Sequence, residues 1–184
     1  MCLPLRLVAV LLGCLCAPAC SRVIGDACTQ NVDCSIAGDR FCDIASPDGY
    51  CTIEGCDHDT CPDGAVCVRF FTLMRGAPGC DPRTARLLRA DCPPNDASCC
   101  RPGDGLCCAP GELCLCSDAD CRRAYCASET SERRWCMRPC NDHGQCRQGY
   151  VCMYTGHSGA ELVPRPGQTE AVAPVGFCAP APQR

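Results

Sequence analysis

The sequence predicts a small disulfide-rich fold, built from short β-hairpins and irregular loops in tandem cysteine-rich units. Cysteine makes up 26 of the 184 residues, which is well above the roughly 8–10% that marks a disulfide scaffold. The chain has only four Phe, four Tyr and one Trp, so it has few large apolar side chains to bury. Disulfides must therefore replace much of the usual hydrophobic core.

The N-terminus has the pattern of an export signal. One positive side chain, Arg6, precedes the apolar stretch from Leu7 to Gly13, and the weakly polar run ends at Cys20. This run is shorter than the ~20 residues that span a bilayer. We therefore expect a cleaved signal peptide and an oxidising compartment, in which paired thiols are the default.

The cleavage site has more than one candidate. "LLGC", which ends at Cys14, resembles a bacterial lipobox, in which the cysteine is lipidated and becomes the first residue. This resemblance implies a signal peptide over 1–13, a linker over 14–27 and a lipid anchor in a membrane. "APAC", which ends at Cys20, is a second candidate with a signal over 1–19, and it also fits ordinary A-x-A cleavage. An uncleaved membrane anchor remains the fourth alternative.

From Cys28 onward the chain has 22 cysteines, an even number. We predict that at least twenty of them are paired, mostly within four-cysteine units that form a duplicated pair. These units cover 28–51, 56–80, 116–136 and 140–178. The predicted organisation is a first pair of units over 28–80, a central segment over 81–115, a second pair over 116–178 and a tail over 179–184.

Short turns are expected inside the units. Asp or Asn recurs in the first gap of each unit, where such side chains close turns on the backbone. They are Asn31 and Asp33, Asp57 and Asp59, Asp118 and Asp120, and Asn141 and Asp142. Calcium is the functional alternative, but no gap carries the full ligand set of a calcium loop. "PDGYC", "PDGAVC" and "RQGYVC" predict a tight turn entering a strand that a disulfide holds.

One helix is expected, over about 82–90. Asp81 can cap its first turn and Pro82 suits its first position. Three arginines share one face of this helix at i, i+3 spacing: Arg83, Arg86 and Arg89. The Pro- and Gly-rich stretch over 163–175 predicts a long loop.

Two resemblances appear at this level. The four-cysteine units resemble the cysteine-rich repeats of bacterial exported lipoproteins, whose C-x-D-x-D-C pattern is also similar to the Dickkopf N-terminal cysteine-rich region. The central "CCRPGDGLCCAPGELC" resembles part of a granulin, which implies a stack of hairpins. Neither resemblance implies a specific function.

The sequence gives little support for catalysis or for metal binding. No two cysteines are three positions apart, which removes the C-x-x-C motif of zinc knuckles and thioredoxin-like proteins. His58, His143 and His157 are the only histidines, and "GHSGA" misses the G-x-S-x-G elbow because Ala160 replaces the second glycine. With 17 Arg against 21 acidic residues, general nucleic-acid binding is disfavoured. We expect no enzyme, no cofactor and no bound metal, and a metal-thiolate protein is a distant alternative.

A partner-binding surface is expected where the charge changes sign. Nine acidic residues stand against one arginine over 26–63, whereas arginines exceed acids over 69–101. The loop "VRFFTLMRGAPG" there combines apolar and basic side chains, which favours a contact with a protein partner. The candidate contacts are Phe70, Phe71, Met74, Arg75, Arg83, Arg86 and Arg89. The alternative is that Phe70 and Phe71 are core residues.

The sequence therefore predicts a lipid-anchored, non-catalytic structural or binding module that faces the periplasm or the cell surface, with secretion as the alternative. A protease inhibitor that presents Arg75 from a disulfide-closed loop is the second functional hypothesis.

Overall fold

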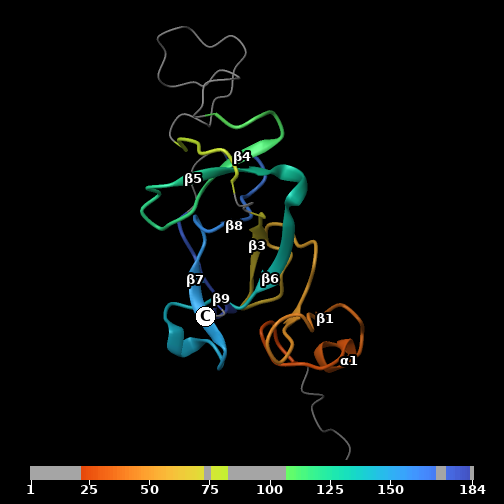
Figure 1. Ribbon diagram of the computed structural model, residues 1–184. Helices are drawn as coiled ribbons and strands as arrows, with labels where there is room; N and C mark the ends of the chain where they lie inside the picture. The colour runs from red at the N-terminus through yellow and green to blue at the C-terminus, as the bar shows by residue number, and fades with distance from the viewer. Residues whose placement is uncertain (1–21, 73–75, 83–106, 169–172, 183–184) are drawn as a thin grey trace, which may run out of the picture.

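The computed structural model describes residues 22–72, 76–82, 107–168 and 173–182. These residues form short antiparallel strand pairs joined by turns, with one four-residue α-helix and short 3-10 turns (Figure 1). The predicted small disulfide-rich fold is confirmed. The expected helix over 82–90 lies outside the described residues, except for Pro82. The elements are α1 Asn31–Cys34, β1 Phe41–Cys42, β2 Cys51–Thr52, β3 Val66–Phe70, β4 Glu112–Cys116, β5 Ala124–Ser128, β6 Arg133–Met137, β7 Tyr150–Tyr154, β8 Ala160–Leu162, β9 Gly176–Pro180, and the 3-10 helices Glu129–Ser131 and His143–Gln145.

Every described cysteine is oxidised. Nine disulfides join eighteen of them, and Cys107 is also disulfide-bonded. The pairs are Cys28–Cys42, Cys34–Cys51, Cys56–Cys67, Cys61–Cys136, Cys80–Cys114, Cys108–Cys126, Cys116–Cys121, Cys140–Cys152 and Cys146–Cys178. Disulfides at this density are typical of an extracellular or otherwise oxidising environment.

Eight of the nine disulfides build one repeated arrangement, which we call a module. In each module the first cysteine bonds the third and the second bonds the fourth, and the third and fourth face each other across an antiparallel strand pair. An aromatic residue directly precedes every fourth cysteine: Tyr50, Trp135, Tyr125 and Phe177. The cysteines are 28, 34, 42 and 51 in module 1; 56, 61, 67 and 136 in module 2; 80, 108, 114 and 126 in module 3; and 140, 146, 152 and 178 in module 4.

Modules 2 and 3 are nested, which differs from the linear units that the cysteine spacing predicts. Module 3 is inserted between the third and fourth cysteines of module 2, Cys67 and Cys136. Six of the nine disulfides lie within the predicted units, and three cross their boundaries. The physical reason is strand pairing, because β3 pairs with the distant β6 and so brings Cys67 opposite Cys136.

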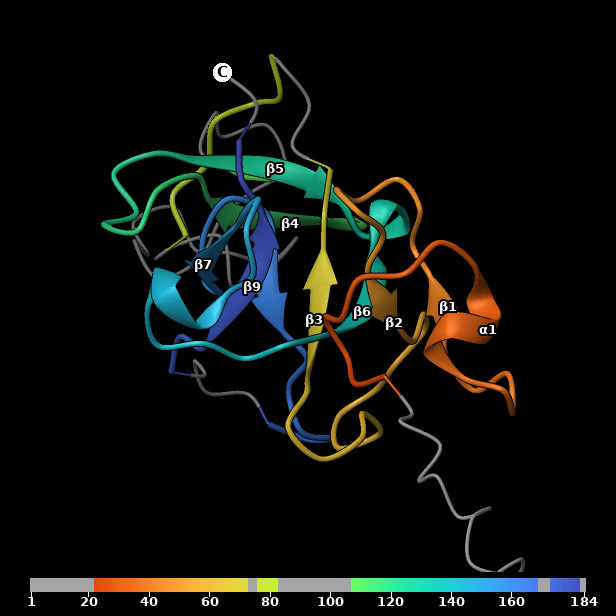
Figure 2. The same cartoon turned by 90° about the horizontal axis from the view of Figure 1, so that it is seen from below.

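The central sheet has the order β6, β3, β8. Figure 2 shows β3 in the middle of the molecule, with β7 and β9 to one side and β1 and β2 to the other. Val68 on β3 and Phe177 on β9 are fully buried in one cluster that also includes Ile24 from module 1. Modules 1, 2 and 4 therefore share a small core. Module 3 buries a separate cluster of Phe71, Leu115 and Ala127.

The turn prediction is confirmed for three of the eight Asp and Asn residues: Asp33, Asp118 and Asp142. The Asp33 carboxylate accepts hydrogen bonds from the backbone N–H of Thr29 (2.8 Å) and of Gln30 (3.2 Å), at the start of α1. Those bonds, led by the one from the Thr29 backbone, lower the Asp33 pKa. Asp118 accepts from the Arg122 N–H and Asp142 from the Gly144 N–H, each at 2.8 Å. These side chains satisfy turn donors that short loops leave open.

Modules 1 and 4 meet through two stacked tyrosines. The rings of Tyr50 and Tyr150 lie 5.4 Å apart, and the Arg147 guanidinium lies 4.0 Å from the centre of the Tyr150 ring. Arg147 also donates to the carbonyls of Pro47 and Gly49. The Tyr50 hydroxyl accepts from the Arg138 N–H at 2.9 Å. This junction fixes the two modules against each other.

Alkaline pH is expected to weaken this junction. Burial raises the Tyr50 pKa to about 12, whereas an unfolded tyrosine titrates near 10. The folded state therefore favours the neutral phenol, so this stabilisation is complete below about pH 10 and is lost as the pH rises toward about 12. Urea unfolding across this window should show a stability loss of up to about 1.4 kcal/mol per pH unit. An equal loss in Tyr50→Phe would contradict the assignment.

Candidate functional site

The expected partner-contact residues are only partly within the described structure. Phe71 is 6% exposed and packs in the module 3 cluster, with the Arg69 guanidinium 5.5 Å from its ring centre. Phe70 is half-buried and meets the Phe177 ring edge to face at 5.6 Å. Both phenylalanines are therefore core residues, the alternative that the sequence left open. The other candidates lie outside the described residues: Cys14, Cys20, Met74, Arg75, Arg83, Arg86 and Arg89.

Every cysteine in the described clusters that could suggest a metal site is in a disulfide. Four such groups consist of cysteines from one module each, and a fifth adds Glu112 to a module 3 disulfide. A disulfide sulfur has no thiolate charge, so these described groups offer no thiolate ligands while they are oxidised.

Two of the three histidines serve local structure. His143 Nδ1 accepts the Cys152 N–H at 3.0 Å, inside module 4. His157 lies in the tight turn that joins β7 to β8, with Nδ1 2.9 Å from the Ser158 Oγ. Ser158 has a φ of 56° and is followed by Gly159 with a φ of 77°, which is the conformation of a two-residue hairpin turn. The turn therefore accounts for the unusual Ser158 backbone.

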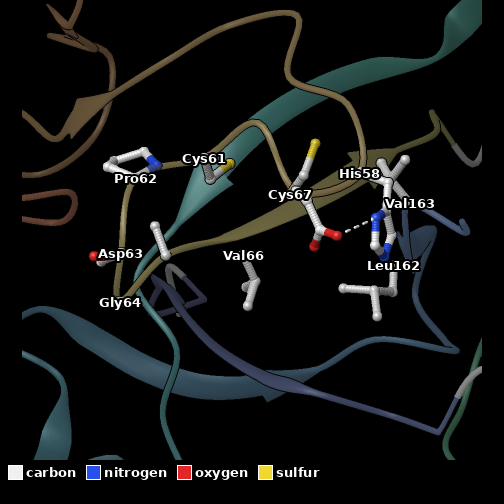
Figure 3. A pocket seen from close by; sticks show the side chains of 11 residues that line it. His58, Cys61, Pro62, Asp63, Gly64, Val66, Cys67, Leu162 and Val163 are labelled. Atoms are coloured by element: carbon white, nitrogen blue, oxygen red, sulfur yellow. Dashed lines mark ion pairs between the residues drawn. The ribbon is translucent and has the colours of Figure 1, made fainter.

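His58 instead lines a groove in the surface (Figure 3). The groove has a volume of about 440 Å³ and is lined by residues 58, 59, 61–67, 162 and 163. One wall is the loop that leads into β3, and the other is the end of β8. Figure 3 shows the His58 ring beside Leu162, with Val66 on the floor and Pro62 and Asp63 at the opposite end. The groove thus combines an apolar floor with polar ends.

The loop wall is held in place by module 2. Thr60 Oγ1 accepts the Asp57 N–H at 2.7 Å and closes a turn, and Asp59 has a left-handed φ of 59°. The disulfides Cys56–Cys67 and Cys61–Cys136 tie this loop to β3 and to β6. These two covalent bonds restrict the conformation of the loop wall before any ligand arrives.

The groove has two carboxylates, and His58 is the one basic side chain in its lining. Asp59 Oδ2 lies 2.9 Å from His58 Nδ1, and the Asp59 side chain is 82% exposed. Asp63 is exposed, and no described residue bonds to its carboxylate. By contrast, the nearby Asp57 is neutralised by Arg134 at 3.1 Å. No arginine lines the groove.

The sequence does not predict this site. His58 and His143 occupy similar turn positions in their units, so the sequence suggests two equivalent surface turns. The two turns differ because Leu162 and Val163 line a groove with the His58 loop and not with the His143 turn. These two residues lie about 100 positions after His58 in the chain. The excess of acidic residues over 26–63 is the one feature of the sequence that points to this site.

A second hollow lies on module 1. Its lining includes Arg22, Asp33, Ile44 and Asp48, and the Ile44 side chain is 75% exposed. Val23, Val32 and Ile36 are also exposed on this module. The hollow has a volume of about 710 Å³ but is more open to solvent than the groove of module 2, which is therefore the stronger candidate site.

Comparison with known proteins gives no relative for this chain: no protein-family model, curated protein or solved structure matches it. Among the described residues, no helix has the length and apolar character needed to cross a bilayer.

Proposed function

We propose that this protein is an exported, non-catalytic binding module, held at a membrane by a lipidated Cys14, that uses rigid disulfide-clamped surfaces to hold a partner. The observation that carries this proposal is that every described cysteine is oxidised, sixteen of them in four modules that bury only small apolar clusters. Such cross-linking keeps surface loops in fixed conformations, which lowers the entropy cost of binding.

The chemistry of the groove favours binding over catalysis. Its lining offers one imidazole and two carboxylates, but no serine, threonine or lysine, and its cysteines are in disulfides. The lining therefore has no hydroxyl, amine or free thiol that the His58 and Asp59 pair could activate as a nucleophile. The groove instead has the features of a contact surface, with an apolar floor and a charged rim.

The anchor is supported by the lipobox-like "LLGC" and by the resemblance to cysteine-rich repeats of exported lipoproteins. More than one acyl chain is needed for stable anchoring, as a bacterial lipoprotein cysteine carries. With such an anchor, the expected location is a membrane surface that faces the periplasm or the outside of the cell.

Intact mass and membrane fractionation test this proposal together. The wild-type protein should have the mass of a lipidated chain that starts at Cys14, and iodoacetamide should add nothing without a reductant. Cys14→Ala should leave the membrane fraction or stay unprocessed, whereas the matched Cys20→Ala should remain anchored. Normal lipidation of Cys14→Ala on Cys20 would contradict the chosen anchor, and several alkylated thiols in the native protein would contradict the oxidised scaffold.

A further inference from the structure

We infer that the groove between the His58 loop and β8 binds a peptide segment of a partner protein that carries an arginine or lysine side chain flanked by apolar residues. This inference rests on the proposed binding function and names the chemistry of the partner.

Charge complementarity selects a cation. The groove presents the carboxylates of Asp59 and Asp63, and its lining contains no arginine to balance them. The Asp59 carboxylate is 82% exposed beside His58, so it keeps free acceptor capacity toward the solvent side. The two carboxylates disfavour an anionic ligand, whereas a guanidinium can hydrogen-bond a carboxylate through two parallel N–H groups.

The apolar floor selects a long side chain with a methylene stem. Figure 3 shows Val66 between the His58 end and the Asp63 end of the groove, with Leu162 beside His58. Ala65, Val66 and Leu162 are each only partly buried, while Val163 is buried. Arginine and lysine pack their stems on such surfaces while the charged group reaches a polar rim. A volume of about 440 Å³ leaves room for that side chain and an apolar neighbour.

The sheet edge favours a peptide over a small amine. β8 is an outer strand of the central sheet. Val163 donates its N–H to the Cys67 carbonyl, and hydrogen-bonded positions alternate along antiparallel strands. Leu162, opposite Val68, therefore directs its N–H and C=O away from β3, and among the described residues none bonds to them. An extended peptide can pair with these groups while its side chain enters the groove.

Fluorescence anisotropy with a labelled peptide, Gly-Val-Leu-Arg-Val-Gly, tests the inference on the intact oxidised protein. Its matched control peptide replaces the arginine with citrulline, which keeps the shape and removes the charge. We expect the arginine peptide to bind at least tenfold more tightly than the citrulline peptide, and its binding to weaken as salt rises, because exposed charges are screened.

The double variant Asp59→Asn/Asp63→Asn should weaken binding of the arginine peptide about five- to tenfold, since one carboxylate pairs with the guanidinium and the other attracts it from the far end of the groove. The matched control is Asp120→Asn, which removes an exposed carboxylate that pairs with Arg122 and is not part of the groove lining. This control should bind the peptide as the wild type does. Circular dichroism and intact mass establish that both variants are folded and oxidised.

Three results would overturn the inference: equal affinity for the two peptides, no effect of the double variant, or no measurable binding. A concentration-dependent dimer that the double variant abolishes would also overturn it, because the occupant would then be a second copy of the chain. These results leave the proposed function standing if the protein is anchored and oxidised. Loss of the anchor or of export contradicts the proposed function without affecting the peptide result.

Discussion

Replacing both Cys61 and Cys136 with alanine is expected to destabilise the protein more than loss of any other described disulfide. These cysteines are 75 residues apart, and closing a loop of that length restricts the unfolded chain by about 4 kcal/mol. Other disulfides within the loop shorten the chain that is released, so this value is an upper limit. Cys136 is also fully buried at the centre of the shared core, so its loss removes packing between β3 and β6 as well.

The matched control replaces Cys116 and Cys121 with alanine. It also removes one disulfide, but its two cysteines are only 5 residues apart. The loop that they close contributes about 2 kcal/mol by the same entropy argument. Denaturant unfolding of the oxidised proteins should therefore show a clearly lower midpoint for the Cys61 and Cys136 variant. Equal midpoints for the two variants would show that the nested arrangement of modules 2 and 3 does not stabilise the fold.

The fold class could be predicted from the sequence. A chain with many cysteines and few aromatic residues must be stabilised by disulfides in place of a large hydrophobic core. Modules 1 and 4 are continuous in sequence, so their cysteines pair within the predicted units. Nesting could not be predicted from spacing, because Cys80 and Cys136 each close a predicted unit but bond to cysteines outside it. One local signal was available: an aromatic residue precedes Cys136, as Tyr50 precedes Cys51.

The candidate site was harder to predict for the same reason. Its two walls come from segments about 100 residues apart, and only the β3 to β8 pairing brings them together. The apolar loop at Phe70 and Phe71 gave a stronger local signal, yet the structure buries Phe71 and half-buries Phe70. In a chain with so few aromatic residues, these side chains are needed for the core.

Gly49→Ala is expected to disrupt module 1. Gly49 has a φ of 66°, and a Cβ at this position would lie 2.0 Å from the Cys28 carbonyl oxygen and 2.9 Å from the Cys28 Sγ. The left-handed backbone alone costs an alanine about 1 kcal/mol. The clash adds an overpacking cost of about 1–3 kcal/mol, because the contacts are a backbone carbonyl and a disulfide sulfur, neither of which can rotate away. We therefore expect a total loss of about 3 kcal/mol, with slower formation of the Cys28–Cys42 disulfide.

Gly38→Ala separates these two costs within the same module. Gly38 has a φ of 79°, but a Cβ there meets no atom within 4 Å. This control should lose only the backbone part, about 1 kcal/mol. Urea unfolding of the two oxidised variants measures the difference, and non-reducing peptide mapping checks that Cys28 still bonds Cys42. If the two variants unfold at the same urea concentration, the close approach of Gly49 to Cys28 does not constrain the protein in solution. A lower midpoint for Gly49→Ala alone shows that this module requires a glycine before its Tyr50 and Cys51 pair.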